Sequence, residues 1–141
     1  MNLALAGRIV SGTVFVVFGA GKFVNHSAEV DSFQTYGLPS PDALVYAIGG
    51  LEIVCGLLLI AGLATRLAAL IMAGNMVVAI AVSGIGQGEV ISLTLAPFQL
   101  CVMAYLLVKG PGPVSLDARF RLFREPGRPA SGGPPTRARP G

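Results

Sequence analysis

Long apolar stretches alternate with short polar breaks along most of the chain. Each of these stretches is close to the about 20 residues that an α-helix needs to cross the hydrocarbon core of a bilayer. The breaks between them contain glycine, proline and charged residues, which favour chain reversals. The pattern predicts four transmembrane helices, at residues 3–24, 43–64, 67–85 and 90–108.

The first apolar stretch also has features of a secretory signal peptide. Arg8 precedes an apolar run, and small residues follow at positions 19–21. However, Lys22 lies where a cleavage region is normally neutral, and three further apolar stretches follow it. We therefore expect the first helix to stay in the protein as a membrane span.

A second kind of pattern follows the fourth span. Glycine and proline alternate at positions 110–113 and end the helix, because proline lacks an amide donor. Leu116, Phe120 and Phe123 then recur at the spacing of one helical face, with arginines between them, and Ser115 is a suitable N-cap. This spacing predicts a short amphipathic helix that lies on an anionic membrane surface.

The chain divides into three parts on this pattern. Residues 1–109 form the four-helix transmembrane bundle, and residues 110–124 form the juxtamembrane amphipathic segment. Residues 125–141 consist almost entirely of Arg, Pro, Gly and Ser. Such a composition buries too little apolar surface to offset the entropy of ordering, so we expect a disordered tail. The predicted fold class is an all-α membrane protein.

Composition supports a membrane protein and argues against several activities. The chain is 53% hydrophobic and 12% charged, whereas soluble domains contain roughly 25% charged residues. The net charge of +3 comes from arginines after Gly110, so we expect no nucleic acid partner. With one histidine, His26, and two cysteines, Cys55 and Cys101, inside apolar runs, we expect no metal site, no haem and no catalytic residue.

The charged residues also predict an orientation. If the four spans alternate in direction, Arg8, Arg66, Lys109 and the arginines of the tail all fall on one side of the membrane. The loops of the other side carry the carboxylates of Glu29, Asp31, Asp42 and Glu89. Basic residues favour the cytoplasmic side, so both termini are expected there, with Arg8 and Arg66 as boundary charges.

Two opposite charges lie inside the predicted spans and need partners. Lys22 is fourteen residues from Arg8, and Glu52 is fourteen residues from Arg66, so both lie about 21 Å from the cytoplasmic boundary. An isolated charge at this depth costs several kcal/mol. We therefore expect Lys22 and Glu52 to form an interior ion pair. Glu52 then serves either as a structural partner or as a proton carrier and ligand contact.

Two amide side chains complete a polar interior. Asn75 and Gln99 fall near the middle of the third and fourth predicted spans. Their amides are suited to hydrogen bonds between helices, and binding of a ligand is the alternative. The candidate site is therefore Lys22 and Glu52 together with these two amides.

Several short motifs, taken in order, are similar to those of one known family. They are Arg8, GAGKF at 19–23, YGLP at 36–39, GGLEIVCG at 49–56, GLATR at 62–66, and GPG followed by SLD within 110–117. This set resembles the DoxX family of small four-helix proteins of the bacterial inner membrane. The similarity does not extend into the arginine-rich tail.

The resemblance implies a function associated with redox systems, because relatives include a quinone-reducing thiosulfate oxidoreductase and oxidative-stress complexes. We expect a non-catalytic membrane subunit that supports such a complex and has no redox centre of its own. A quinone is its expected ligand, and a soluble or membrane oxidoreductase and further copies of the chain are its expected partners. The alternatives are a small proton-coupled transporter that uses Glu52, or an assembly protein that docks through the amphipathic segment and tail.

Overall fold

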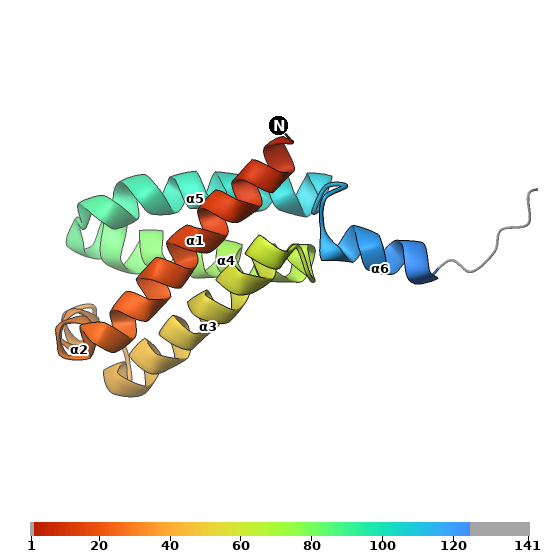
Figure 1. Ribbon diagram of the computed structural model, residues 1–141. Coiled ribbons are helices and arrows are strands. Elements are labelled where there is room, and N and C mark those ends of the chain that lie inside the picture. Colours follow the sequence, from red (N-terminus) through yellow and green to blue (C-terminus); the bar gives the residue numbers. More distant parts are fainter. Residues whose placement is uncertain (1, 125–141) are drawn as a thin grey trace, which may run out of the picture.

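The computed structural model describes residues 2–124, and they fold into helices joined by short turns (Figure 1). The helices are α1 (Leu3–Val24), α2 (His26–Thr35), α3 (Pro41–Ala61), α4 (Thr65–Ala79), the π-helix η1 (Ile80–Ile85), α5 (Val90–Lys109) and α6 (Leu116–Arg124). Four helical segments are long and apolar enough to cross a membrane, one of which joins α4 to η1. The predicted all-α membrane fold is confirmed.

The turn between α3 and α4 is longer than the hydropathy pattern predicted. We expected the second span to run to residue 64, but α3 ends at Ala61. Gly62 adopts φ 72°, and its amide donates to Leu58 O at 2.8 Å, which closes the last turn. Glycine tolerates this left-handed conformation and therefore ends the helix, although the apolar residues continue beyond it.

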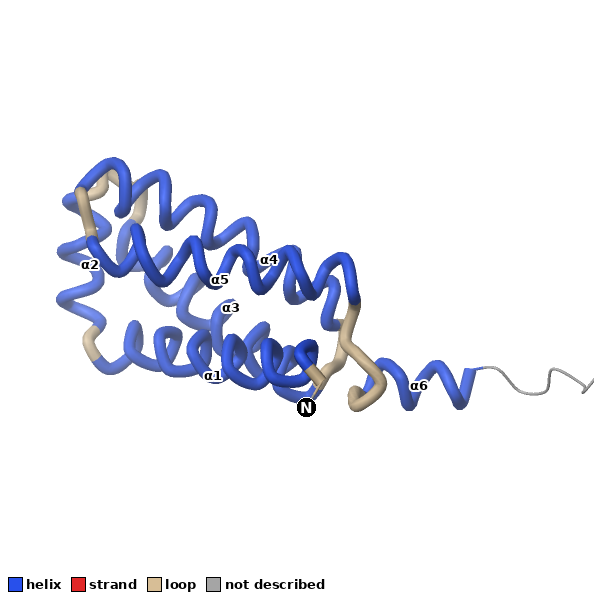
Figure 2. Tube along the Cα trace, turned by 90° about the horizontal axis from the view of Figure 1, so that it is seen from above, coloured by secondary structure: helices blue, strands red, loops and turns tan. Residues whose placement is uncertain are grey.

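Glycines allow α1 and α3 to lie in close contact. The two helices run side by side in both views (Figures 1 and 2). A Cβ atom on Gly12 would lie 2.6 Å from Gly56 O, and one on Gly19 would lie 2.7 Å from Gly49 O. The backbones therefore meet at two levels, as small residues allow in membrane bundles. On the other side of the bundle, α4 packs against α5.

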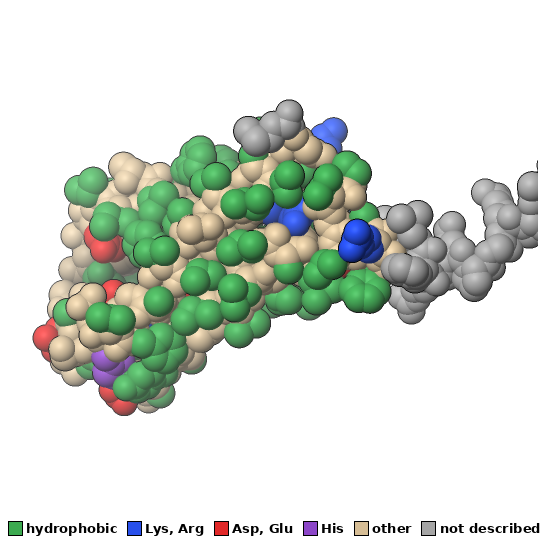
Figure 3. Space-filling model, viewed as in Figure 1, with side chains coloured by type: hydrophobic (Ala, Val, Ile, Leu, Met, Phe, Trp, Pro, Cys, Tyr) green, Lys and Arg blue, Asp and Glu red, His purple; other side chains and the backbone are tan. Residues whose placement is uncertain are grey.

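The outward faces of the bundle are apolar. Leu59, Met72, Met103 and Leu106 form part of the core and are fully buried. Large apolar side chains also cover the outside, as Figure 3 shows for α1 and α3. They include Val17, Leu57, Leu70, Val77, Phe98 and Val108, all more than half exposed. Because water does not favour so large an apolar surface, these faces contact the lipid bilayer.

Two elements were absent from the sequence prediction. Residues 26–35 were expected to be part of a loop, but they form α2, which lies across one end of the bundle (Figure 2). The third span was expected to be an ordinary helix, but its last turns form the π-helix η1. Neither change alters the number of predicted spans.

Helix α6 extends from the opposite end of the bundle (Figures 1 and 2). Ser115 Oγ accepts a hydrogen bond from the amide of Ala118 at 3.1 Å, so its predicted role as N-cap is confirmed. Phe120 is 59% exposed. The contact of this helix with a membrane surface stays a prediction, and the predicted disordered tail, 125–141, lies outside the described residues.

Candidate functional site

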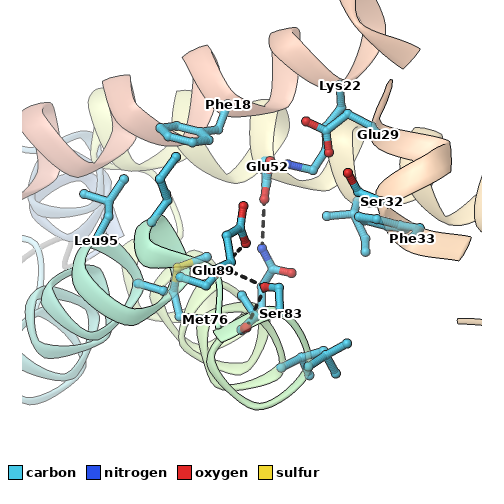
Figure 4. Close-up of a pocket in the computed structure, with 18 of the residues that line it drawn as sticks. Phe18, Lys22, Glu29, Ser32, Phe33, Glu52, Met76, Ser83, Glu89 and Leu95 are labelled. Atoms are coloured by element: carbon cyan, nitrogen blue, oxygen red, sulfur yellow. Dashed lines mark hydrogen bonds and ion pairs between the residues drawn. The ribbon is translucent and has the colours of Figure 1, made fainter. Parts of the chain in front are cut away.

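A cavity of about 270 Å³ lies between the helices near the α2 end of the bundle (Figure 4). Its walls come from α1, α2, α3, α5 and the continuous segment of α4 and η1. Lys22, Glu52, Asn75 and Gln99, the four residues of the candidate site, all line it. Most of its remaining lining is apolar, so the cavity combines a few polar groups with an apolar wall.

Lys22, Glu52 and Asn75 form one connected group. Lys22 Nζ lies 3.0 Å from Glu52 Oε2, and Asn75 Nδ2 donates to Glu52 Oε1 at 3.0 Å. The side chains of Lys22 and Glu52 are only 11% and 6% exposed. Glu52 thus joins α1, α3 and α4, and the attraction is strong because little water screens it. The structure therefore contains the Lys22–Glu52 ion pair that was predicted from their equal distances from the cytoplasmic boundary.

Gln99 lies in the same cavity but makes no hydrogen bond. It is 1% exposed, and among the described residues neither its Nε2 nor its Oε1 has a partner. Both amides were expected to bond between helices; Asn75 does so by donating to Glu52 of α3, whereas Gln99 does not. Buried amides are normally paired, so an unpaired one in a cavity wall is unusual.

A second group of hydrogen-bonded polar side chains lies beside the cavity, at the turn between η1 and α5. Ser92 Oγ donates to Glu89 Oε2 at 2.6 Å and lies 2.7 Å from Ser83 Oγ (Figure 4). Ser83 and Ser92 are buried. Sequence reasoning placed Glu89 in a loop and did not single out the serines. The signal available was the presence of one hydroxyl residue in each of two apolar segments that meet at a tight turn.

Helix α2 contributes the outer part of the lining. The helix supplies Glu29 and Phe33, and its C-cap residue is Tyr36. Phe18 of α1 lines the same cavity. Burial, together with the nearby carboxylates of Glu89 and Glu29, raises the pKa of Tyr36 above its ordinary value. The Tyr36 phenol is therefore protonated at neutral pH. Because α2 was expected to be a loop, no sequence pattern placed these residues at the site.

Arg8 and Arg66, the two predicted boundary charges, lie at the other end of the bundle. Arg66 is exposed, whereas Arg8 is only 2% exposed. That both arginines mark the cytoplasmic boundary stays a prediction. Its guanidinium donates to four backbone carbonyls: Leu59 at 2.9 Å, Ile60 at 3.1 Å, Pro111 at 2.8 Å and Val114 at 2.6 Å. Arg8 thus fastens the end of α3 to the segment that follows α5.

Neither cysteine lines the cavity. Cys55 is buried and Cys101 is exposed, and both are free thiols. Within residues 2–124, no three side chains of the His, Cys, Asp or Glu type are grouped so that they could hold a metal ion. The cavity itself presents an ion pair, amides, hydroxyls and carboxylates beside an apolar wall.

The fold and the site define a multi-pass helical membrane protein with a polar cavity inside its bundle. Residues 3–84, more than half of the chain, match the family model described as DoxX, so the chain belongs to the DoxX family. It is 34% identical over 73 residues to a Bacillus subtilis (strain 168) protein named "Putative oxidoreductase CatD". That match covers 52% of this chain and 53% of the relative, about half of each. No solved structure matches the chain.

Proposed function

We propose that this protein is a membrane subunit of a redox complex and that its cavity holds a quinone or a similar lipid-soluble ligand. The observation that carries the proposal is the joint position of the Lys22–Glu52–Asn75 group and the unpaired amide of Gln99 in one largely apolar cavity. Ligand sites commonly combine an apolar wall with a few convergent polar groups. The name of the Bacillus subtilis relative supports a redox context.

In this proposal the chain binds and orients the ligand but contributes no redox centre. Electrons then pass between the ligand and a partner oxidoreductase. Lys22 and Asn75 hold the Glu52 carboxylate in place, and Gln99 supplies hydrogen bonds to the head of the ligand. The apolar wall accommodates the hydrophobic remainder of the ligand. The expected location is the bacterial plasma membrane, with the Arg66 end of the bundle in the cytoplasm.

The partner is proposed to meet the chain at α6. This helix extends away from the bundle and presents Phe120, and Asp117 anchors its first turn by accepting from the amides of Ala64 and Thr65. The same feature favours a second candidate function, in which the protein is an assembly factor and the cavity only stabilises it. The two candidates differ in whether the cavity is occupied.

A pull-down from native membranes tests the proposal. The tagged chain is purified in mild detergent, and mass spectrometry identifies the co-purifying proteins and the bound lipids and quinones. We expect an oxidoreductase and a quinone with the wild type, and a loss of the quinone with Glu52→Gln. A partner without any quinone in both samples would favour the assembly function. If neither a partner nor a quinone co-purifies with the wild type, the proposal is contradicted. Proton-coupled transport through Glu52 then becomes the function to test.

A further inference from the structure

The unpaired amide of Gln99 restricts the chemistry of the ligand. An amide has donors on Nε2 and an acceptor on Oε1, and both are unpaired here. A carbonyl can accept from Nε2 but leaves Oε1 without a donor. An ammonium group can donate to Oε1 but cannot accept from Nε2. A hydroxyl group does both, so it matches this amide better than either alternative.

The charges around the cavity also favour a ligand that carries a hydroxyl group. Glu29, Glu52 and Glu89 line it, and among its described lining residues Lys22 is the one basic side chain. Lys22 is already paired with Glu52. The carboxylates of Glu29 and Glu89 therefore leave a surplus of hydrogen-bond acceptors. A ligand that brings O–H donors satisfies them, whereas a ligand with carbonyl oxygens alone places acceptors beside acceptors.

The shape of the ligand follows from the aromatic part of the lining. Phe15 of α1 lines the cavity together with Phe18 of α1 and Phe33 of α2, and the last two are labelled in Figure 4. Aromatic side chains pack well against a planar ring, in offset or edge-to-face arrangements. The cavity thus offers an aromatic environment next to groups that recognise hydroxyls.

We propose that the cavity binds a membrane-soluble aromatic alcohol, that is, a phenol or hydroquinone, through its hydroxyl group, with Gln99 both donating to and accepting from that group. The proposal rests on the proposed function and refines it, because it assigns the reduced form of the ligand to the site. It concerns binding alone and requires no electron or proton transfer by this chain. Gln99 is the residue that sets this preference.

Four probes with the same alkyl tail test the proposal on the full chain in lipid nanodiscs. They are decylubiquinol, its dimethyl ether, decylubiquinone and decylammonium, each measured by anaerobic equilibrium dialysis. The dimethyl ether keeps the ring and the tail but has no O–H group. We expect the quinol to bind about fivefold more tightly than its ether and the quinone, because both of these can still accept from Nε2 but neither can donate to Oε1.

Gln99→Leu supplies the second arm of the test. This substitution removes the amide and keeps a similar volume, so the quinol should lose its advantage and bind like its ether. Gln87→Leu is the matched control, because Gln87 is exposed and outside the cavity, and its quinol binding should stay at the wild-type value. If Gln99→Leu does not fold, the comparison of the quinol with its ether on the wild type still tests the preference for a hydroxyl group.

The possible outcomes separate this inference from the proposed function. Equal binding of the quinol, the ether and the quinone would overturn the preference for a hydroxyl and leave the proposed function standing. Tighter binding of the ammonium probe would overturn the inference in favour of a cation site. No binding of any probe to folded wild-type protein would overturn both. A quinol preference that survives in Gln99→Leu would overturn the role of Gln99.

Discussion

Two buried polar side chains at opposite ends of the bundle, Arg8 and Gln99, differ in their hydrogen bonding. At the α6 end, Arg8 is fully enclosed, and its guanidinium donates to four backbone oxygens of the α3 terminus and the segment after α5. At the α2 end, Glu52 is paired, but the amide of Gln99 is not, and a cavity of about 270 Å³ adjoins both. The Arg8 guanidinium thus has hydrogen-bond partners within the chain, whereas the Gln99 amide has none among the described residues.

This difference shows how to separate a structural charge from a ligand site within one membrane protein. A buried charge is costly in either case. Where backbone carbonyls accept the hydrogen bonds of the charged group, no donor is left for a ligand, and the residue stabilises the fold. Where unpaired hydrogen-bonding groups adjoin a cavity, a ligand can supply their partners. Substitutions at the two ends should therefore affect different quantities, stability at the first and binding at the second.

The largest loss of stability is expected from Arg8→Met. The substitution removes the hydrogen bonds to four carbonyl oxygens, so the free energy of unfolding should fall by about 4 kcal/mol. Unfolding in detergent, followed by circular dichroism, measures this change. Arg66→Met removes an exposed arginine at the same end of the bundle and should leave stability nearly unchanged. Equal effects of the two substitutions would show that the buried bonds of Arg8 are not what stabilises this end.

The next largest effect is expected at the ion pair. Glu52→Leu leaves the Lys22 ammonium buried without its partner and should lower the free energy of unfolding by about 3 kcal/mol. The double variant Lys22→Met with Glu52→Leu should recover at least half of that loss, because no uncompensated charge remains. A double-mutant cycle on the same unfolding assay provides the measurement. Simple addition of the two single effects would contradict a direct coupling.

A smaller effect is expected where α1 and α3 meet between the two ends. Gly56→Ala places a methyl group 2.7 Å from Gly12 O, so the helices must move apart, at about 2 kcal/mol. Gly50→Ala is the control within the same helix, since nothing lies within 4 Å of its added Cβ. It should be neutral or slightly stabilising. Thermal unfolding of both variants distinguishes close helix contact from a general intolerance of alanine in α3.

The smallest effect is expected at the anchor of α6. Both carboxylate oxygens of Asp117 accept from backbone amides at the start of α4, Ala64 N at 2.8 Å and Thr65 N at 2.9 Å. Asp117→Asn replaces one of these acceptors with a donor and should cost about 1 kcal/mol. Hydrogen exchange should become faster in α6 and stay unchanged at the cavity. Asp31→Asn, an exposed carboxylate on α2, is the control and should change neither region.

The sequence predicted the spans and the polar interior because both depend on simple spacing. Hydropathy over about 20 residues marks a membrane helix, and the rise of about 1.5 Å per residue placed Lys22 and Glu52 at one level. Their facing positions then followed from the need to pair charges in lipid. Spacing along separate helices could not show which partner Asn75 takes, because that depends on the rotation of each helix about its axis.

The rest of the site depends on local backbone features that hydropathy does not reveal. Helix α2 is short and polar, so its residues read as a loop, although it carries Glu29 and Phe33 to the cavity. The π-helix η1 contributes Ser83, and no change in composition accompanies it. The burial of Arg8 could not be predicted, because the segment after α5 that encloses it is held by tertiary contacts.

The most direct test of the central claim is the amount of quinone and quinol that remains bound to the protein purified from native membranes. It should be measured per mole of folded chain in the wild type, Gln99→Leu and the control Gln87→Leu. We predict a bound ligand in the wild type and the control, about tenfold less in Gln99→Leu, and no loss of stability in that variant. The same ligand content in all three, or none in the wild type, would contradict the assignment of the cavity as the ligand site.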